Sequence, residues 1–357
     1  MSPDSSLLAR MSSPAQRRTK IDTLRGLACL LLVFYHAVDG YTRASLLKEG
    51  SLLVSFGDSF TYLRMPLFTF LSGYVYALKP VQTAMLVRFA QGKLRRLGLP
   101  LLFVGLPLAL LQVYLGSEGE HSLIDALWSP LYPITVLWYL DALLLIFLLV
   151  AVLELGGLLR TPLHLGGCLA VALVATLWSG DGSGLLAISG ALYLLPFFLL
   201  GVWAQRFAVR PSRSTRRVAV ASLWLIVPLC GLPVLLLDRD TLLESKTLPW
   251  AIGLSAASCL ALYFLDWRNM TLARLGAYSY AVFLFHTLFI SGSRIVMKQL
   301  QLDDYIASEW LLAMSFACGL VGPILLQRLV RHWRLVHMVL LGSAASPRRE
   351  RGEVSRA

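Results

Sequence analysis

The chain has few charged residues: Asp, Glu, Lys and Arg make up 15% of its 357 residues, whereas hydrophobic residues make up 57%. A soluble domain carries about 25% charged and about 45–50% apolar residues. The composition therefore excludes a soluble enzyme and a disordered chain, because neither combines so little charge with so much apolar surface. It is typical of a polytopic membrane protein.

Cysteine is also scarce, and the five residues present lie in apolar segments with no pair at the spacing of a metal site. This excludes a secreted disulfide scaffold and a zinc site. Residues 1–20 lack the apolar region and cleavage site of a signal peptide. The net charge of +12 forms no basic face interleaved with aromatic residues, so we expect no nucleic-acid partner. Catalytic Ser/His/Asp spacing and a Gly-rich phosphate loop are missing too.

Apolar runs of about 17–25 residues are abundant, and each is near the length of a helix that crosses a bilayer. We predict ten spans, at about 24–41, 59–79, 98–115, 133–153, 164–180, 185–204, 218–237, 247–265, 277–297 and 308–327. Most of the 32 Lys and Arg residues fall in alternate loops, which by the positive-inside rule places both termini in the cytoplasm.

The resulting expectation is an all-α membrane protein in three parts. A basic cytoplasmic segment covers residues 1–20, and a membrane domain of about ten helices covers 21–330. A basic cytoplasmic tail covers 331–357, and we expect its end to be disordered and to face lipid headgroups.

Ionisable side chains within the predicted spans are the first candidates for function, because such groups are costly in hydrocarbon. They are Arg25, His36, Arg64, Asp141, His286 and Arg294. Arg25 and His36 are eleven residues apart, so a helix places them on one stripe, separated by about 16 Å along its axis. This pattern favours a cation near the cytoplasmic end and, deeper, a base that can accept a proton from a hydroxyl. The rival interpretation is a snorkelling Arg and a His packed in a helix contact.

The other buried ionisable residues leave alternatives open. Arg64, near the outer end of its span, binds an anionic or sugar acceptor or else pairs with Asp141. Asp141 orients an imidazole or neutralises Arg64 or Arg294. His286 supports the site or is a core histidine that donates to a carbonyl. In the same span as Arg64, Ser72 and the glycine after it form a small pair suited to close helix packing.

A basic cluster precedes the third predicted span, at Lys93, Arg95 and Arg96. Part of this charge is ordinary positive-inside charge. Lys93 and Arg96, however, are three residues apart and share one face of a helix that enters the membrane. Such a cluster suits the phosphates of a cytoplasmic ligand, because Arg matches phosphate geometry with two parallel hydrogen bonds.

Five segments together resemble one known family, the integral-membrane acyltransferase 3 family. They are Ile21-Asp22-Thr-Leu-Arg25-Gly-Leu with the later His36, Leu-Phe-Thr-Phe-Leu-Ser72-Gly73-Tyr, Lys93-Leu-Arg95-Arg96-Leu ahead of Pro100, Leu137-Trp138-Tyr139-Leu140, and Leu275-Gly276-Ala-Tyr278-Ser279-Tyr280 running to Phe285-His286. The resemblance covers about residues 20–330, nearly the whole membrane domain.

The resemblance implies an O-acyltransferase of the bacterial inner membrane. Such an enzyme moves an acetyl or succinyl group from cytoplasmic acyl-CoA, a co-substrate and not a resident cofactor, to a hydroxyl of an envelope glycan or glycolipid. The family's essential Arg and His correspond to Arg25 and His36. Its Arg-Arg-x-x-Arg motif corresponds to residues 92–96, where Gly-Lys-Leu-Arg-Arg departs from the pattern at Lys93.

These residues predict a mechanism in which Lys93, Arg95 and Arg96 hold the phosphates of acyl-CoA and His36 is the general base. Arg64 then stabilises the oxyanion. The competing hypothesis is a transporter or flippase of a lipid-linked or small anionic substrate, which would use the same buried charges as a path. That class often shows inverted repeats and broken helix pairs, which the sequence does not display. A sensor or scaffold without catalysis is a third hypothesis.

Overall fold

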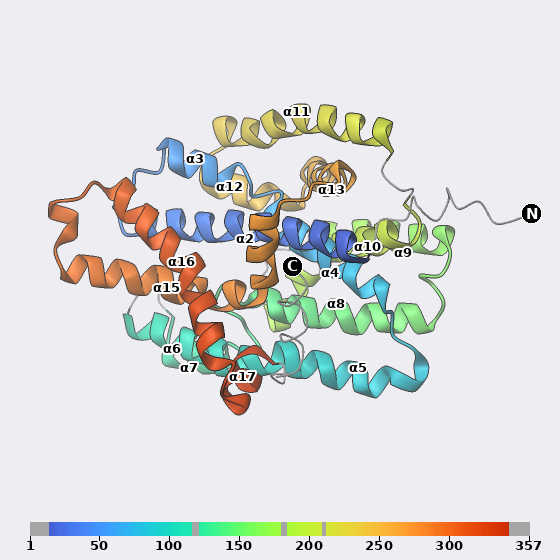
Figure 1. The fold of residues 1–357 in the computed structure, drawn as a ribbon, viewed down its shortest axis with the longest axis horizontal. Coiled ribbons are helices and arrows are strands. Elements are labelled where there is room, and N and C mark those ends of the chain that lie inside the picture. The colour runs from blue at the N-terminus through green and yellow to red at the C-terminus, as the bar shows by residue number, and fades with distance from the viewer. Residues whose placement is uncertain (1–13, 116–120, 180–183, 209–211, 343–357) are drawn as a thin grey trace, which may run out of the picture.

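The computed structural model describes residues 14–115, 121–179, 184–208 and 212–342, and throughout these residues the secondary structure is helical (Figure 1). The α-helices are α2 (Pro14–Arg43), α3 (Leu52–Asp58), α4 (Arg64–Leu78), α5 (Leu86–Lys93), α6 (Leu106–Leu115), α7 (Leu123–Trp128), α8 (Trp138–Leu155), α9 (Pro162–Ala175), α10 (Ile188–Arg206), α11 (Arg213–Leu236), α12 (Arg239–Glu244), α13 (Pro249–Leu265), α14 (Met270–Ala277), α15 (Ser279–Gln299), α16 (Ser308–Val330) and α17 (Arg334–Leu341). Short 3-10 turns are η1 (Thr83–Met85), η4 (Thr176–Trp178), η5 (Leu185–Ala187), η6 (Ser245–Thr247) and η7 (Leu302–Asp304), and π-helical segments are η2 (Leu94–Gly98) and η3 (Leu101–Gly105).

The two predicted terminal segments lie only partly within the described residues. Residues 1–13 and 343–357 are outside them. Residues 14–20 already belong to α2, and α17 occupies most of the described residues after 331. The first transmembrane helix therefore begins earlier in the chain than its apolar run, because helical structure continues through the basic residues before it.

The structure is that of a multi-pass membrane protein with fewer full-length spans than the ten predicted. Seven helical stretches are long and apolar enough to cross a bilayer, namely Arg18–Arg43, Thr83–Tyr114, Trp138–Leu155, Leu185–Arg206, Arg213–Leu236, Ser279–Gln299 and Ser308–Val330. An eighth results if Arg239–Thr247 and Pro249–Leu265, bent by 77°, count as one span. Within the described residues the number of candidate spans is thus seven or eight.

Two predicted spans, at 59–79 and 164–180, are helical but short. Their helices α4 and α9 have 15 and 14 residues. At 1.5 Å per residue neither reaches across the hydrocarbon core of about 30 Å. α4 begins only at Arg64, because residues 59–63 form a turn, and most of its side chains are buried. Hydropathy does not distinguish such a core helix from one that faces lipid, and this is why the sequence predicts ten spans where the described residues give seven or eight candidates.

Glycines allow α4 and α10 to pack closely against each other. A Cβ at Gly73 on α4 would overlap the carbonyl oxygen of Phe198 on α10, and one at Gly201 would overlap that of Phe70. The predicted role of the Ser-Gly pair in close helix packing is therefore confirmed at Gly73. α2 lies in the middle of the molecule and contacts α4, α14, α15 and α16 (Figure 1). Different faces of α2 thus contact different helices of the membrane domain.

The helical run before and after Pro100 contains the two π-helical segments. Proline has no N–H to donate, and the wider π turns change the angular position of the residues around it. Such segments occur frequently at functional sites. Here they place the side chains that follow α5 against α8 and α15.

Candidate functional site

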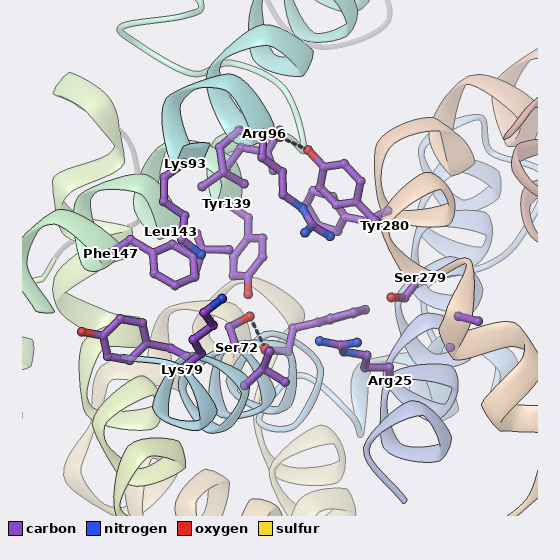
Figure 2. Close-up of a pocket in the computed structure, with 18 of the residues that line it drawn as sticks. Arg25, Ser72, Lys79, Lys93, Arg96, Tyr139, Leu143, Phe147, Ser279 and Tyr280 are labelled. Carbon is purple, nitrogen blue, oxygen red and sulfur yellow. Dashed lines mark hydrogen bonds between the residues drawn. The ribbon is translucent and has the colours of Figure 1, made fainter. Parts of the chain in front are cut away.

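A cavity of about 410 Å³ lies between α2, α4, α5, α8 and α15. Its described lining contains no carboxylate. Four cations line it, namely Arg25, Lys79, Lys93 and Arg96. We call it the basic cavity. Figure 2 shows the nitrogen ends of Lys79, Lys93 and Arg25 turned toward the space around the Tyr139 hydroxyl. Because like charges repel at close range, this arrangement is best suited to an anionic ligand with several charges.

Aromatic side chains hold two of these cations in place. The Lys93 ammonium lies 3.3 Å from the ring centroid of Phe147. The Arg96 guanidinium lies 5.3 Å from the ring centroid of Tyr280, whose hydroxyl donates a hydrogen bond to the Arg96 carbonyl oxygen. Cation–π contacts of this kind keep a positive charge positioned without neutralising it. The cations therefore remain available to a ligand.

Arg25 is positioned by its own helix. Its Nη1 lies 3.3 Å from Oδ1 of Asp22, three residues earlier on α2. Ser279, at the start of α15, lines the cavity beside it (Figure 2). The start of α15 can lie this close to α2 because residue 276, on the preceding helix α14, is a glycine. A Cβ at that position would overlap the Asp22 carbonyl oxygen. The close spacing of α2 and α14 thus depends on a residue without a side chain.

A second, smaller cavity of about 160 Å³ lies deeper along α2 and contains both buried histidines. We call it the histidine cavity; its lining residues are Leu32, Tyr35, His36, Thr61, Arg64, Met65, Val136, Trp138, Tyr193, Leu243, Lys246, Phe283 and His286. The ring centroids of His36 and His286 are 5.0 Å apart. The described lining has no carboxylate, and it includes two imidazoles and the Arg64 cation, groups that can transfer a proton or stabilise negative charge.

Phe283 lies between the two cavities, because its side chain lines both. Its ring centroid lies 5.3 Å from that of Tyr139 and 6.2 Å from that of Phe68, both of which line the basic cavity. These three rings form an aromatic junction between the cations at one end and the histidines at the other. An extended ligand that passes this junction would place one end beside His36 and keep its charged end in the basic cavity.

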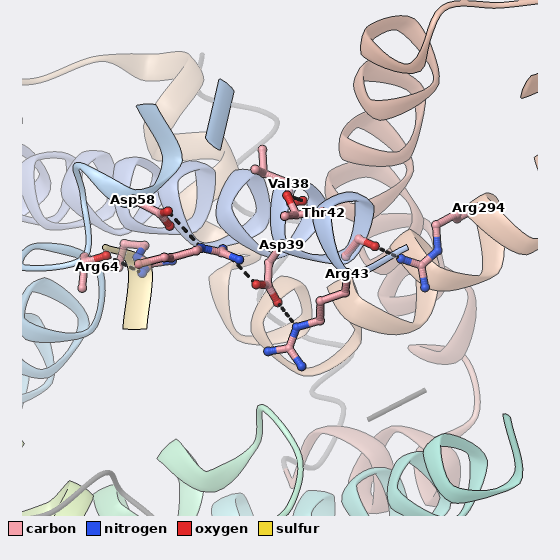
Figure 3. Close-up of polar contacts among 10 residues, drawn as sticks. Val38, Asp39, Thr42, Arg43, Asp58, Arg64 and Arg294 are labelled. Carbon is pink, nitrogen blue, oxygen red and sulfur yellow. Dashed lines mark hydrogen bonds and ion pairs between the residues drawn. The ribbon is translucent and has the colours of Figure 1, made fainter. Parts of the chain in front are cut away.

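A network of ion pairs fixes the outer side of the histidine cavity (Figure 3). Arg239 on α12 lies 2.9 Å from Asp39 on α2 and 3.0 Å from Asp58 on α3. Arg43 lies 3.0 Å from the other oxygen of Asp39. The short segment that carries Leu243 and Lys246 into the cavity lining is thus tied to two other elements. Paired charges of this kind also keep both carboxylates away from the histidines.

Arg64 has no carboxylate partner among the described residues. It donates to Thr61 Oγ1 at 3.1 Å, and its guanidinium stacks 3.3 Å from the Tyr35 ring centroid. The predicted pairing of Arg64 with Asp141 is not found, and Asp141 forms no ion pair with any described residue. Arg294 instead donates to the carbonyl oxygen of Gly40. Arg64 therefore brings a positive charge to the histidine cavity that no described carboxylate neutralises.

The structure separates the predicted site residues into three groups. Arg25, Ser72, Lys93 and Arg96 line the basic cavity, and His36, Arg64 and His286 line the histidine cavity. Arg95, Asp141 and Arg294 line neither. Arg95 is exposed on the far side of its turn, whereas Asp141 is buried in α8. The predicted phosphate cluster thus keeps Lys93 and Arg96 and not their neighbour Arg95.

Sequence reasoning missed three kinds of residue in this site. From the sequence, Lys79 is interpreted as one of the basic residues that set the orientation in the membrane, and Tyr139 as an aromatic residue of the membrane interface. Phe283 is interpreted as an ordinary core residue. The only signal was position: Phe283 precedes His286 by three residues, and Tyr139 precedes Asp141 by two. Neither spacing distinguishes a cavity residue from a packing residue.

Comparison with known proteins gives one match. The model of the acyltransferase 3 family, described as an acyltransferase domain, matches residues 18–337. No curated protein and no solved structure matches the chain significantly. The family match includes both cavities and every element that lines them.

Proposed function

The chain belongs to the acyltransferase 3 family, and from this premise we propose that it is a membrane O-acyltransferase of the bacterial inner membrane. It takes an acetyl or succinyl group from cytoplasmic acyl-CoA and transfers it to a hydroxyl of an envelope glycan or glycolipid. The observation that supports this is the pair of cavities on either side of Phe283, one with four cations and one with two histidines. An acyl-CoA has the matching shape, with phosphates at one end and a thioester at the other.

The predicted topology agrees with this division of the site. Lys79, Lys93 and Arg96 belong to a loop predicted to be cytoplasmic, whereas Arg239 and Lys246 belong to one predicted to be outside. The basic cavity then meets the cytoplasmic donor, and the histidine cavity meets the acceptor from the other side. Acyl transfer at the aromatic junction makes transport of CoA across the membrane unnecessary.

His36 is the general base in this proposal. Its unprotonated nitrogen takes the proton of the acceptor hydroxyl while the oxygen attacks the thioester carbonyl. Arg64, buried and without a carboxylate partner among the described residues, stabilises the negative charge on the carbonyl oxygen. The C–S bond then breaks, and the departing CoA thiolate takes the proton from His36. The products are the acylated acceptor and free CoA.

The test is binding and turnover of radiolabelled acetyl-CoA and succinyl-CoA by the purified protein. We expect saturable binding to the wild type and at least tenfold weaker binding to Arg96→Ala, because a charge-assisted phosphate contact is lost. His36→Ala should bind the donor normally but release CoA only at a small residual rate. The matched control is Arg88→Ala, which removes an exposed cation of the same helix outside the basic cavity.

The transporter hypothesis gives the opposite result in the same experiment. A transporter or flippase has no need of an acyl-CoA site, so a folded protein that binds neither ester would contradict the acyltransferase proposal. Normal CoA release by His36→Ala would leave acyl transfer intact and remove His36 as the base.

A further inference from the structure

The second buried histidine has a fixed tautomer. Nδ1 of His286 lies 2.9 Å from the carbonyl oxygens of both Val282 and Phe283 on its own helix. A carbonyl oxygen only accepts hydrogen bonds, so Nδ1 carries the proton. In the neutral ring Nε2 is then unprotonated and acts as an acceptor. This assignment follows from the chemistry of the two oxygens and needs no view of the hydrogen.

Nε2 of His286 is buried and has no hydrogen-bond partner among the described residues. The residue is 1% exposed. Buried polar atoms are almost always paired, and an unpaired one costs about 1–3 kcal/mol. An acceptor kept in this state beside a cavity needs a donor in some step of the function.

His36 is the residue placed to supply that donor. The two rings line the histidine cavity with centroids 5.0 Å apart and planes tilted by 46°. Two imidazoles joined by an N–H···N bond of about 2.9 Å have their centroids about 5 Å apart. The separation of the two rings therefore matches that of a hydrogen-bonded imidazole pair.

We propose that His286 is a positioning residue for His36. Its Nε2 accepts the N–H of His36, which turns the other, unprotonated nitrogen of His36 toward the acceptor hydroxyl. During transfer that second nitrogen takes the hydroxyl proton and passes it to the CoA thiolate, while the bond to His286 persists. The inference rests on the proposed function, because it assigns a role within the same site.

This arrangement does the orienting work that a carboxylate does in a Ser-His-Asp triad. A neutral imidazole orients its partner without adding a negative charge, which in this cavity would pair with Arg64 and take that cation away from the oxyanion. It also links the base to the aromatic junction, because one of the carbonyls that fix His286 belongs to Phe283. The position of a donor at the junction and the orientation of the base thus depend on one turn of α15.

The experiment compares His286→Asn with His286→Gln. Asparagine keeps a donor near the Nδ1 position, whereas glutamine places an acceptor oxygen near the position of Nε2. With acetyl-CoA and succinyl-CoA as donors and water as the acceptor, we expect His286→Asn to lower kcat about 100-fold with KM within twofold. His286→Gln should recover at least tenfold of that loss. His164→Asn, a change at an exposed histidine, is the matched control.

A double variant separates positioning from a general effect on the fold. If His286 acts only through His36, adding His286→Asn to His36→Ala should leave the residual rate within threefold. A further large loss in that background, or equal activity of His286→Asn and wild type, would overturn the inference and leave the acyltransferase proposal standing. A wild-type protein that turns over neither ester would contradict both.

A spectroscopic measurement tests the tautomer without using activity. Nitrogen-15 histidine spectra of the protein in lipid bilayers, assigned through His286→Gln, should show a His286 signal protonated at Nδ1 and not at Nε2. Protonation at Nε2 would overturn the inference even in a variant series too unstable for kinetics.

Discussion

Arg64 is the residue whose environment makes the sharpest prediction at the scale of single side chains. It is 6% exposed, and no described carboxylate pairs with it. We expect Arg64→Met, which keeps an unbranched stem but removes the guanidinium, to lower kcat about 100-fold, as the loss of an oxyanion contact does. Arg64→Lys should keep part of the rate because it keeps the charge. The rate of CoA release measures both; a kcat for Arg64→Met within threefold of wild type would show that the guanidinium has no part in the reaction.

Much of the site could be predicted from single residues, for a physical reason. A charge inside an apolar run is costly, so Arg25, His36, Arg64 and His286 stand out against their neighbours. Phe283 carries no such cost and does not stand out. Asp141 carries it and yet lines neither cavity, which shows that a buried charge is a candidate and not a proof.

Within the basic cluster the three-residue spacing already placed Lys93 and Arg96 on one helix face, and the structure puts these two residues, and not Arg95, in the basic cavity. What the sequence could not predict is that the turn there is π-helical and not α-helical. A π segment has no signature in the hydropathy pattern, and it changes which face each side chain occupies. Predictions of helix faces are therefore least secure at this kind of element.

At the scale of elements, one side chain ties α12 to two other helices. Arg239 is 19% exposed and joins α12 to Asp39 and Asp58, and Asp58 is only 4% exposed. Arg239→Ala leaves these two carboxylates without that partner, so we expect a loss of about 2–3 kcal/mol in the free energy of unfolding. Thermal denaturation of the purified protein in detergent measures the loss as a lower midpoint.

The control for this prediction is Arg43→Ala. Arg43 also pairs with Asp39, but its side chain is 56% exposed. An exposed pair contributes at most about 1 kcal/mol, so the midpoint should fall less than for Arg239→Ala. Equal midpoints for the two variants would mean that the Arg239 pairs contribute no more than surface pairs.

The number of spans is also a question of elements, and here the sequence was least informative. α4 and α9 have the composition of membrane helices, but α4 is surrounded by other helices and both are short. The length of an apolar run records composition alone, whereas the length of a helix also depends on where turns such as residues 59–63 begin. Positions of helices were thus predictable, and their ends and lipid exposure were not.

At the scale of the whole molecule, the proposal requires the two cavities to open on opposite sides of the membrane. The prediction places Arg88 in the cytoplasm and Asp303 outside, and both residues are exposed. The chain's own described cysteines are buried or half-buried, so a new exposed cysteine should dominate labelling. In spheroplasts, a maleimide that cannot cross membranes should label Asp303→Cys, and Arg88→Cys only after the membrane is permeabilised.

This labelling result decides between two ways of using the same site. If Asp303 and Arg88 lie on opposite sides, a donor held by Lys93 and Arg96 and an acceptor beside Arg64 approach from different compartments and meet at Phe283. If both cysteines react in intact spheroplasts, donor and acceptor enter from one side, and the reason for a divided site disappears. The aromatic junction would then lie between two parts of one substrate path, and not between two compartments. Cytoplasmic acyl-CoA would be the wrong donor.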